Sequence, residues 1–434
     1  MLTVNTTHSY RRRSIAALAA LTMVVAACGS DDEPATTDAP AESEAPADTD
    51  AAPAETEAPA DTMADDAMDE EAPADTAMDE EAPADTAMDE EAPADTDADD
   101  ASEGDAGSTL DLDANGDGEV RIGIAAAGPR DDGAYYQAVV DAAETFSEEN
   151  GFGDVIVVDN IQAADAATEL ANLAQQPVDI VIVGASEIAE PMPDLAEQYS
   201  DLFWYCNCGA GFPESEFYLQ SQDNGAGIAY TAGVATGILL RDSGGDAVTL
   251  IGCCDLGFEI QHYMSYELGL KSVDESLQFT YVPSGDFPFD FDNVQNATAA
   301  YENAVAEGAD AIYPYLGGAH EPIVQLANEG GQIVLSAGAS DVCTREGDLS
   351  WDIAVRFDGG DYVREIFPQI LDGSAAEGDI ITYSPGEEPD VAGAVICDAT
   401  PEQQAEMDDA YALVASGELD GEFGRIAGEA FGGE

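Results

Sequence analysis

From Val120 onward, short apolar segments of strand length alternate with longer segments of helical periodicity. In the first unit, residues 120–137, the β-branched Ile122 and Ile124 precede the break at Gly128-Pro129. Asp131 or Asp132 can then cap a helix that carries Tyr135 in its first turn. Such alternation builds parallel sheets with helices on both faces. The pattern therefore predicts an α/β fold.

The alternation occurs in two successive series, over residues 120–240 and 248–336. We therefore expect two Rossmann-like lobes with parallel sheets, joined by a multi-strand hinge with a ligand cleft between them. The remaining tail is too short for a third domain. We expect this tail to pack on the first series. Lobe 1 would then comprise about residues 119–222 and 358–434, and lobe 2 about residues 223–357.

The N-terminus has the pattern of a secretory signal. Arg11-Arg12-Arg13 precede an apolar segment over residues 15–27, which is shorter than a membrane span. Val25-Ala26-Ala27-Cys28 resembles a bacterial lipobox, in which the cysteine becomes the lipidated first residue. We expect a lipoprotein signal peptide over residues 1–27 and an anchor at Cys28. A plain signal peptide with a chance cysteine is the alternative.

Residues 28–118 have the composition of a disordered acidic stalk. The unit AMDEEAPADT occurs three times in succession, at 67–76, 77–86 and 87–96. Few large apolar side chains are present to offset chain entropy, and like charges keep such a segment extended. An adhesive or cation-binding role for the repeats is the alternative.

The segment from Asp113 to Gly118 begins like an EF-hand calcium loop, with the spacing D-x-N-x-D-G. The twelfth position, where such a loop needs a bidentate Glu, is Ile124. We therefore expect an acidic linker end, with a calcium loop as the alternative. The chain is expected to need neither a metal nor a cofactor.

Charge excludes one class of partner. The chain has 91 acidic and 11 basic residues and a formal net charge of -80. Nucleic-acid binding rests on clustered Lys and Arg, so we expect no nucleic acid polymer as a partner. From residue 119 on, 58 acidic residues face only 8 basic ones, so the folded part is itself strongly anionic.

Six cysteines follow Cys28: Cys206, Cys208, Cys253, Cys254, Cys343 and Cys397. In an exported protein an even set indicates disulfides, up to three, with the pairing left open. A metal site made from the first four and His262 is the alternative.

No catalytic constellation is recognisable. The first βα turn lacks G-x-G-x-x-G, and the chain has no P-loop, no G-x-S-x-G and no HExxH. We therefore expect that the chain is not an enzyme.

Several stretches together resemble the basic membrane protein (BMP) family. They are DDGAYYQ at 131–137, VDIVIVG at 178–184, AGVA at 232–235, Gly317-Gly318 and DIAVR at 352–356. The similarity covers residues 120–400 in order. It implies a periplasmic-binding-protein type I fold and a lipoprotein that delivers purine nucleosides and related solutes to an ABC importer.

The resemblance also implies ligand-binding positions. Tyr135 takes the place of the family's stacking Phe, Tyr136 that of an Asn, and Asn207 that of a base-binding Asp. His262 or Tyr263 falls at the second stacking position, Asp341 near the ribose-binding Asp, and Arg356 at a family Lys. The further candidates are Asp131, Asp132, Gln137, Gly184, Gly317 and Gly318.

These features together predict a lipid-anchored, extracytoplasmic solute-binding component of an ABC importer. Its expected partners are a small-molecule ligand, the permease and, through Cys28, the cell membrane. We expect it to act as a monomer. A sensory receptor that passes its ligand state to a signalling partner is the alternative for the same domain.

The charge generates a testable prediction. Self-repulsion among the acidic residues is screened by salt, and at about 1 M salt the Debye length is only about 3 Å. We expect the melting temperature of the protein to rise as salt is increased, as in a protein from a saline habitat. Equal melting temperatures at low and high salt would contradict this hypothesis.

Overall fold

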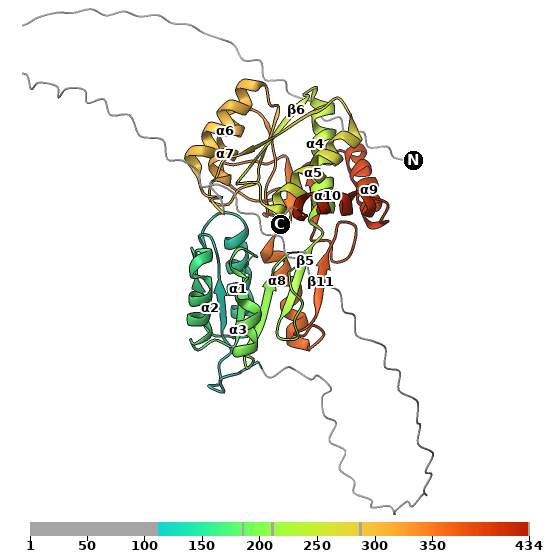
Figure 1. Cartoon of the computed structure of the whole chain (residues 1–434). Coiled ribbons are helices and arrows are strands. Elements are labelled where there is room, and N and C mark those ends of the chain that lie inside the picture. The colour runs from blue at the N-terminus through green and yellow to red at the C-terminus, as the bar shows by residue number, and fades with distance from the viewer. Residues whose placement is uncertain (1–111, 185, 210–211, 286–288, 433–434) are drawn as a thin grey trace, which may run out of the picture. The chain divides into compact units, whose positions relative to one another are not determined.

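The computed structural model describes residues 112–184, 186–209, 212–285 and 289–432 (Figure 1). The chain separates into two units, Met1–Asp97 and Ala98–Glu434. All the elements described below belong to the second unit. The predicted signal peptide, the predicted lipidation site Cys28 and the repeats lie outside the described residues.

Lobe 1 contains a six-stranded parallel sheet, in the order β11-β5-β4-β3-β1-β2. The strands are β1 (Ile122–Ala125), β2 (Ile156–Val158), β3 (Ile180–Val183), β4 (Phe203–Asn207), β5 (Leu219–Asp223) and β11 (Ile380–Tyr383). Strands β1 and β3 in the middle of the sheet are fully buried and carry no polar side chain, because helices cover both faces of the sheet.

Alternate residues of β1 show how the two faces are filled. Ile122 and Ile124 belong to an apolar cluster that includes Phe146 of α1 (Tyr135–Asn150), and α1 packs against α8 (Gly359–Asp372). Ala125 belongs to a second cluster with Leu170 of α2 (Ala166–Ala174) and Leu195 of α3 (Met192–Gln198). The sheet is therefore a buried central layer.

Lobe 2 has a four-stranded parallel sheet in the order β7-β6-β8-β9, continued by the antiparallel pair β10-β12 through an isolated bridge between Leu335 and Ile353. The strands are β6 (Ala247–Gly252), β7 (Gln278–Pro283), β8 (Ala311–Pro314), β9 (Ile333–Val334), β10 (Ile353–Arg356) and β12 (Gly393–Ile396). The helices are α4 (Gly225–Ser243), α5 (Gly257–Val273), α6 (Val294–Glu307) and α7 (His320–Gly330).

Helices α4 and α5 cross at very short range because glycine stands at the contact. A Cβ added at Gly233 would lie 2.0 Å from the carbonyl oxygen of Tyr266, and one at Gly269 would lie 2.0 Å from that of Tyr230. The small residues of α4 therefore allow its backbone to approach its neighbour.

The chain crosses between the lobes three times, after β5, β10 and β11. Asn224 follows β5 and caps α4 by accepting a hydrogen bond from the Gly227 N–H (2.9 Å). Its side chain donates to the Ser384 hydroxyl (3.0 Å), and its backbone N–H donates to the Tyr383 carbonyl (2.8 Å). The first and third crossings are thus tied together, as in a hinge formed by a few element ends.

One expectation about the lobes was wrong. Residues 358–434 do not all return to lobe 1: α8 and β11 do, but β12 pairs with β10. Helices α9 (Pro401–Ala415) and α10 (Asp420–Phe431) pack on α4 and α5 respectively (Figure 1). Strand β11 was missed because it is a four-residue edge strand whose Ile380 is exposed.

The last residues of the predicted stalk belong to the folded unit. Leu112 is buried, and the Asn115 N–H donates to Asp179 Oδ1 (3.3 Å). The Asp113 carboxylate accepts hydrogen bonds from the N–H groups of Asp117 (3.1 Å) and Gly118 (2.9 Å). Ile124, at the twelfth position of the calcium-loop pattern, is fully buried in β1.

None of the helices among the described residues combines the length and the apolar character required to cross a membrane.

The cysteines form three disulfides, Cys206–Cys208, Cys253–Cys254 and Cys343–Cys397, which confirms the expected disulfide chemistry. Of these three, Cys343–Cys397 closes a long loop, with a sequence separation of 54.

This disulfide generates a testable prediction. We expect the double variant Cys343→Ser, Cys397→Ser to lower the free energy of unfolding by about 4 kcal/mol, measured by denaturant titration. The control Cys253→Ser/Cys254→Ser should lose much less, because its loop hardly restricts the unfolded chain. Equal losses would contradict this assignment.

Candidate functional site

A cavity of about 820 Å³ lies between the lobes. Its walls are the loops that follow the carboxyl ends of the strands. Lobe 1 contributes residues after β1, β2, β3, β4 and β5, and lobe 2 contributes residues after β6, β7, β8, β9 and β10. Open α/β sheets bind ligands at this edge. The cavity is therefore the candidate ligand site.

Asp132 organises the first wall of the cavity. Its carboxylate accepts hydrogen bonds from the N–H groups of Ala134 (2.9 Å), Gln137 (3.0 Å) and Tyr136 (3.3 Å). Burial raises the pKa of Asp132, and these hydrogen bonds offset part of that rise. Of the two aspartates expected to cap this helix, Asp132 does so. Its role in the cavity wall is to fix the first turn of α1.

The capped turn places Tyr135 and Tyr136 in the cavity wall. The Tyr135 hydroxyl donates to the Gly184 carbonyl (2.6 Å) and accepts from Asn207 Nδ2 (2.8 Å). The two tyrosine rings meet edge to face at a centroid distance of 5.5 Å. Tyr135 is thus held by the ends of β3 and β4, while Asn207 itself also lines the cavity.

Lobe 2 supplies a second aromatic wall. The His262 ring lies 4.5 Å from that of Tyr315, and Tyr315 lies 5.6 Å from Phe357, between ring centroids. His262 Nε2 is 2.9 Å from the Tyr313 hydroxyl. Burial lowers the pKa of His262 to about 3, so the imidazole is neutral at physiological pH.

Four of the predicted site residues line a neighbouring, more polar pocket instead: Asp131, Gln137, Gly318 and Asp341. Gln137 Oε1 accepts a hydrogen bond from the Gly133 N–H (3.1 Å). Asp341 forms an ion pair with Arg345 (2.6 Å). Gly317, by contrast, does line the main cavity.

Two further candidates lie away from both pockets. Arg356 forms an ion pair with Asp390 (2.6 Å) and donates to the Tyr411 hydroxyl (3.0 Å). Arg356 pairs with Gly393 of β12, and its side chain lies beside that strand and α9. Tyr263 stacks on Tyr281 with a centroid distance of 4.4 Å. Neither side chain reaches the cavity.

Sequence reasoning missed several wall residues, among them Glu187, Asp223, Phe258, Phe357 and Phe431. Glu187 follows β3 and Asp223 ends β5, so the strand-end rule could have found both once those strands were assigned. Phe431 comes from the end of α10, and no local pattern in the sequence indicates that this helix reaches the cavity.

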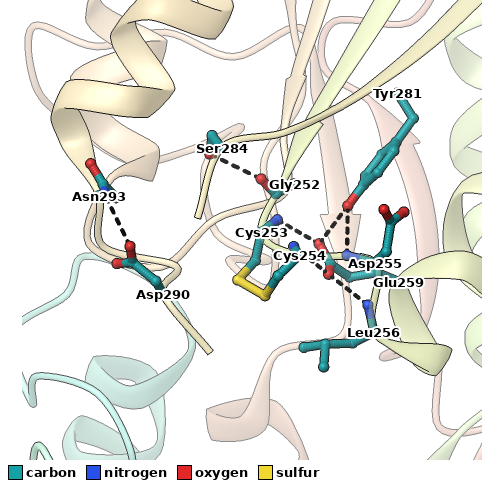
Figure 2. Close-up of a disulfide and its surroundings, with 10 residues drawn as sticks. All are labelled: Gly252, Cys253, Cys254, Asp255, Leu256, Glu259, Tyr281, Ser284, Asp290 and Asn293. Carbon is teal, nitrogen blue, oxygen red and sulfur yellow. Dashed lines mark hydrogen bonds between the residues drawn. A yellow bond between two sulfur atoms is a disulfide. The ribbon is translucent and has the colours of Figure 1, made fainter. Parts of the chain in front are cut away.

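Two of the disulfides stand at strand ends beside the cavity, one in each lobe. Cys206–Cys208 encloses Asn207 at the end of β4, and Cys208 lines the cavity. Cys253–Cys254 follows β6, where the Glu259 carboxylate accepts from the backbone N–H groups of both cysteines (2.6 and 3.0 Å; Figure 2). The alternative prediction of a metal site was wrong, because the four cysteines expected as ligands form the disulfides Cys206–Cys208 and Cys253–Cys254.

Comparison with known proteins agrees with this architecture. The family model described as "ABC transporter substrate-binding protein PnrA-like" (Bmp) matches residues 119–341. The members of such a family bind small solutes outside the cytoplasm and present them to a permease. A search of curated proteins found no match.

Solved structures show the same fold at low sequence identity. An ABC transporter solute-binding protein from Conexibacter woesei is 20% identical, with a TM-score of 0.53 over 69% of this chain and 97% of that one. A solute-binding protein from Aeropyrum pernix is 14% identical, with a TM-score of 0.54 over 72% and 90%. Both support a type I periplasmic-binding-protein fold.

The family model matches just over half of the chain. The chain therefore belongs to the Bmp family of PnrA-like ABC transporter substrate-binding proteins.

Proposed function

We propose that this chain is the solute-binding component of an ABC importer, anchored to the outer face of the cell membrane by lipidated Cys28 and acting as a monomer. The observation that carries the proposal is the cavity, because the strand-end loops of both lobes line it. A solute in this position bridges the lobes. It shifts the open–closed equilibrium by its preference for the closed state, which the permease recognises.

We propose a purine nucleoside or a related compound as the solute. A cavity of about 820 Å³ falls in the size range of small-molecule sites. Tyr135 and Tyr136 on one wall and His262 and Tyr315 on the other offer flat rings for a heterocycle. Asn207 adds an amide for hydrogen bonding. Gly184 is proposed to act indirectly, through its carbonyl on Tyr135.

The stacking role of Tyr135 can be tested by calorimetric titration of the detergent-solubilised, full-length protein with adenosine, guanosine and inosine. Base–aromatic stacking contributes about 1 to 3 kcal/mol. We expect Tyr135→Ala to weaken nucleoside binding by about 5- to 150-fold. Tyr263→Ala is the matched control, because this ring stacks on Tyr281 outside the cavity. Equal losses in the two variants would contradict the stacking role of Tyr135, and a wild type that binds none of the three would exclude a neutral purine nucleoside as the solute.

The anchor has its own test. We expect the wild-type protein in the membrane fraction after cell lysis and Cys28→Ser in the soluble fraction, since the variant lacks the thiol that carries the lipid. Ser30→Ala should remain with the membrane. Cys28→Ser that stays in a salt-washed membrane pellet would show that another segment holds the protein.

A further inference from the structure

The cavity wall carries no positively charged side chain. Among the described residues that line it there is neither Lys nor Arg. His262, the other side chain there that can become cationic, is neutral because burial lowers its pKa to about 3. Phosphate or carboxylate solutes would therefore meet no charge partner in this wall.

Five carboxyl groups from the described residues line the cavity, and three of them accept hydrogen bonds that fix the surrounding loops. Asp132 accepts from three backbone N–H groups, Asp292 from the Gly318 N–H (2.5 Å) and Asp290 from Asn293 Nδ2 (2.8 Å). These three hold the loops that form the wall. The other two are Glu187 and Asp223, one after β3 and one at the end of β5.

Glu187 has unused hydrogen-bonding capacity. Its Oε2 atom is buried and has no hydrogen-bond partner within the described part of the chain. Burial raises the pKa of Glu187, and its own N–H and Tyr136 offset this only in part. Burial likewise raises the pKa of Asp223, opposed only by its own N–H. A buried carboxylate oxygen without a partner is costly, and a cation beside it removes that cost.

Aromatic rings share the cavity wall with these two carboxyl groups. Burial is the main cause of the raised pKa of Tyr135 in lobe 1 and of Tyr315 in lobe 2, and the negative charges of Glu187 and Asp223 add to both. The two carboxyl groups therefore act on rings from both walls of the cavity. Aromatic faces beside a carboxylate attract organic cations.

We propose that the solute carries a positive charge, and that Glu187 and Asp223 hold its cationic group between the tyrosine rings of the two lobes. The solute class is an organic cation with a flat ring, such as a nucleoside whose base bears a positive charge. This inference rests on the proposed function, because it assigns the solute of the same cavity.

The acidity of the whole chain does not account for this arrangement. Most acidic residues of the folded part face water, where solvent and counterions satisfy them. Glu187 instead places an unpartnered oxygen in a wall that also contains Tyr136, Phe258 and Phe291. The geometry at this position, rather than the overall charge, points to a cation.

Calorimetric titration of the detergent-solubilised, full-length protein tests the proposal with two matched pairs of probes. In each pair one nucleoside is cationic at neutral pH and the other neutral: 1-methyladenosine with adenosine, and nicotinamide riboside with its reduced form. We expect the cationic member of at least one pair to bind about 10- to 100-fold more tightly than its neutral partner.

Variants separate the charge from the shape of the cavity. We expect Glu187→Gln, which keeps the size of the side chain, to reduce this preference about tenfold or more. Asp223→Asn is a second variant should the first fail to fold, and Glu190→Gln, at an exposed position on the same loop, should behave as wild type.

The results of these experiments distinguish failure of the cation inference from failure of the proposed function. Neutral nucleosides that bind as tightly as their cationic partners would overturn the cation inference and leave the nucleoside function standing. A preference for cations that neither Glu187→Gln nor Asp223→Asn reduces would overturn the assignment to these carboxyl groups. Binding of no probe in either pair would reject both the cation inference and the nucleoside class.

Discussion

Parallel pairing of the strands in both lobes is the constraint on which the rest of the structure depends. Parallel strands send all their carboxyl ends to one edge of a sheet, and here both sheets direct that edge toward the same cavity. The side chains that follow β1, β3, β4, β6 and β8 meet there although they are far apart in the chain. The Asn224 side chain ties two of the crossings that keep the sheets together.

The wall of the cavity divides its polar groups between structure and binding. The Asp132 carboxylate accepts from backbone N–H groups and fixes the first turn of α1. Glu259, which does not itself line the cavity, fixes the loop after β6 in the same way. The Cys206–Cys208 disulfide joins the two neighbours of Asn207 and so restricts the backbone at that residue. Glu187 and Asp223 line the same wall together with several aromatic rings, and we propose that these two carboxyl groups contact the solute.

Sequence reasoning predicted the site best where function and chain order coincide. Tyr135 was found because it begins the helix after the first strand, and a helix start at that place must face the strand-end edge. Arg356 was expected in the site because it falls at a family Lys, yet its side chain is occupied by Asp390 and Tyr411 beside β12. Strand β11 went unrecognised because it is an edge strand of only four residues, too short for its apolar run to stand out.

By itself, the sequence determined the fold class, the two series of strands and helices, the disulfide chemistry and the family, because hydrophobic periodicity and residue order are local properties of the chain. The tertiary structure alone decided which residues meet. It gave α9 and α10 to lobe 2, brought Phe431 from the end of α10 to the cavity, and left Glu187 Oε2 without a partner. Burial and long-range contact depend on all the elements at once, so no single stretch of sequence encodes them.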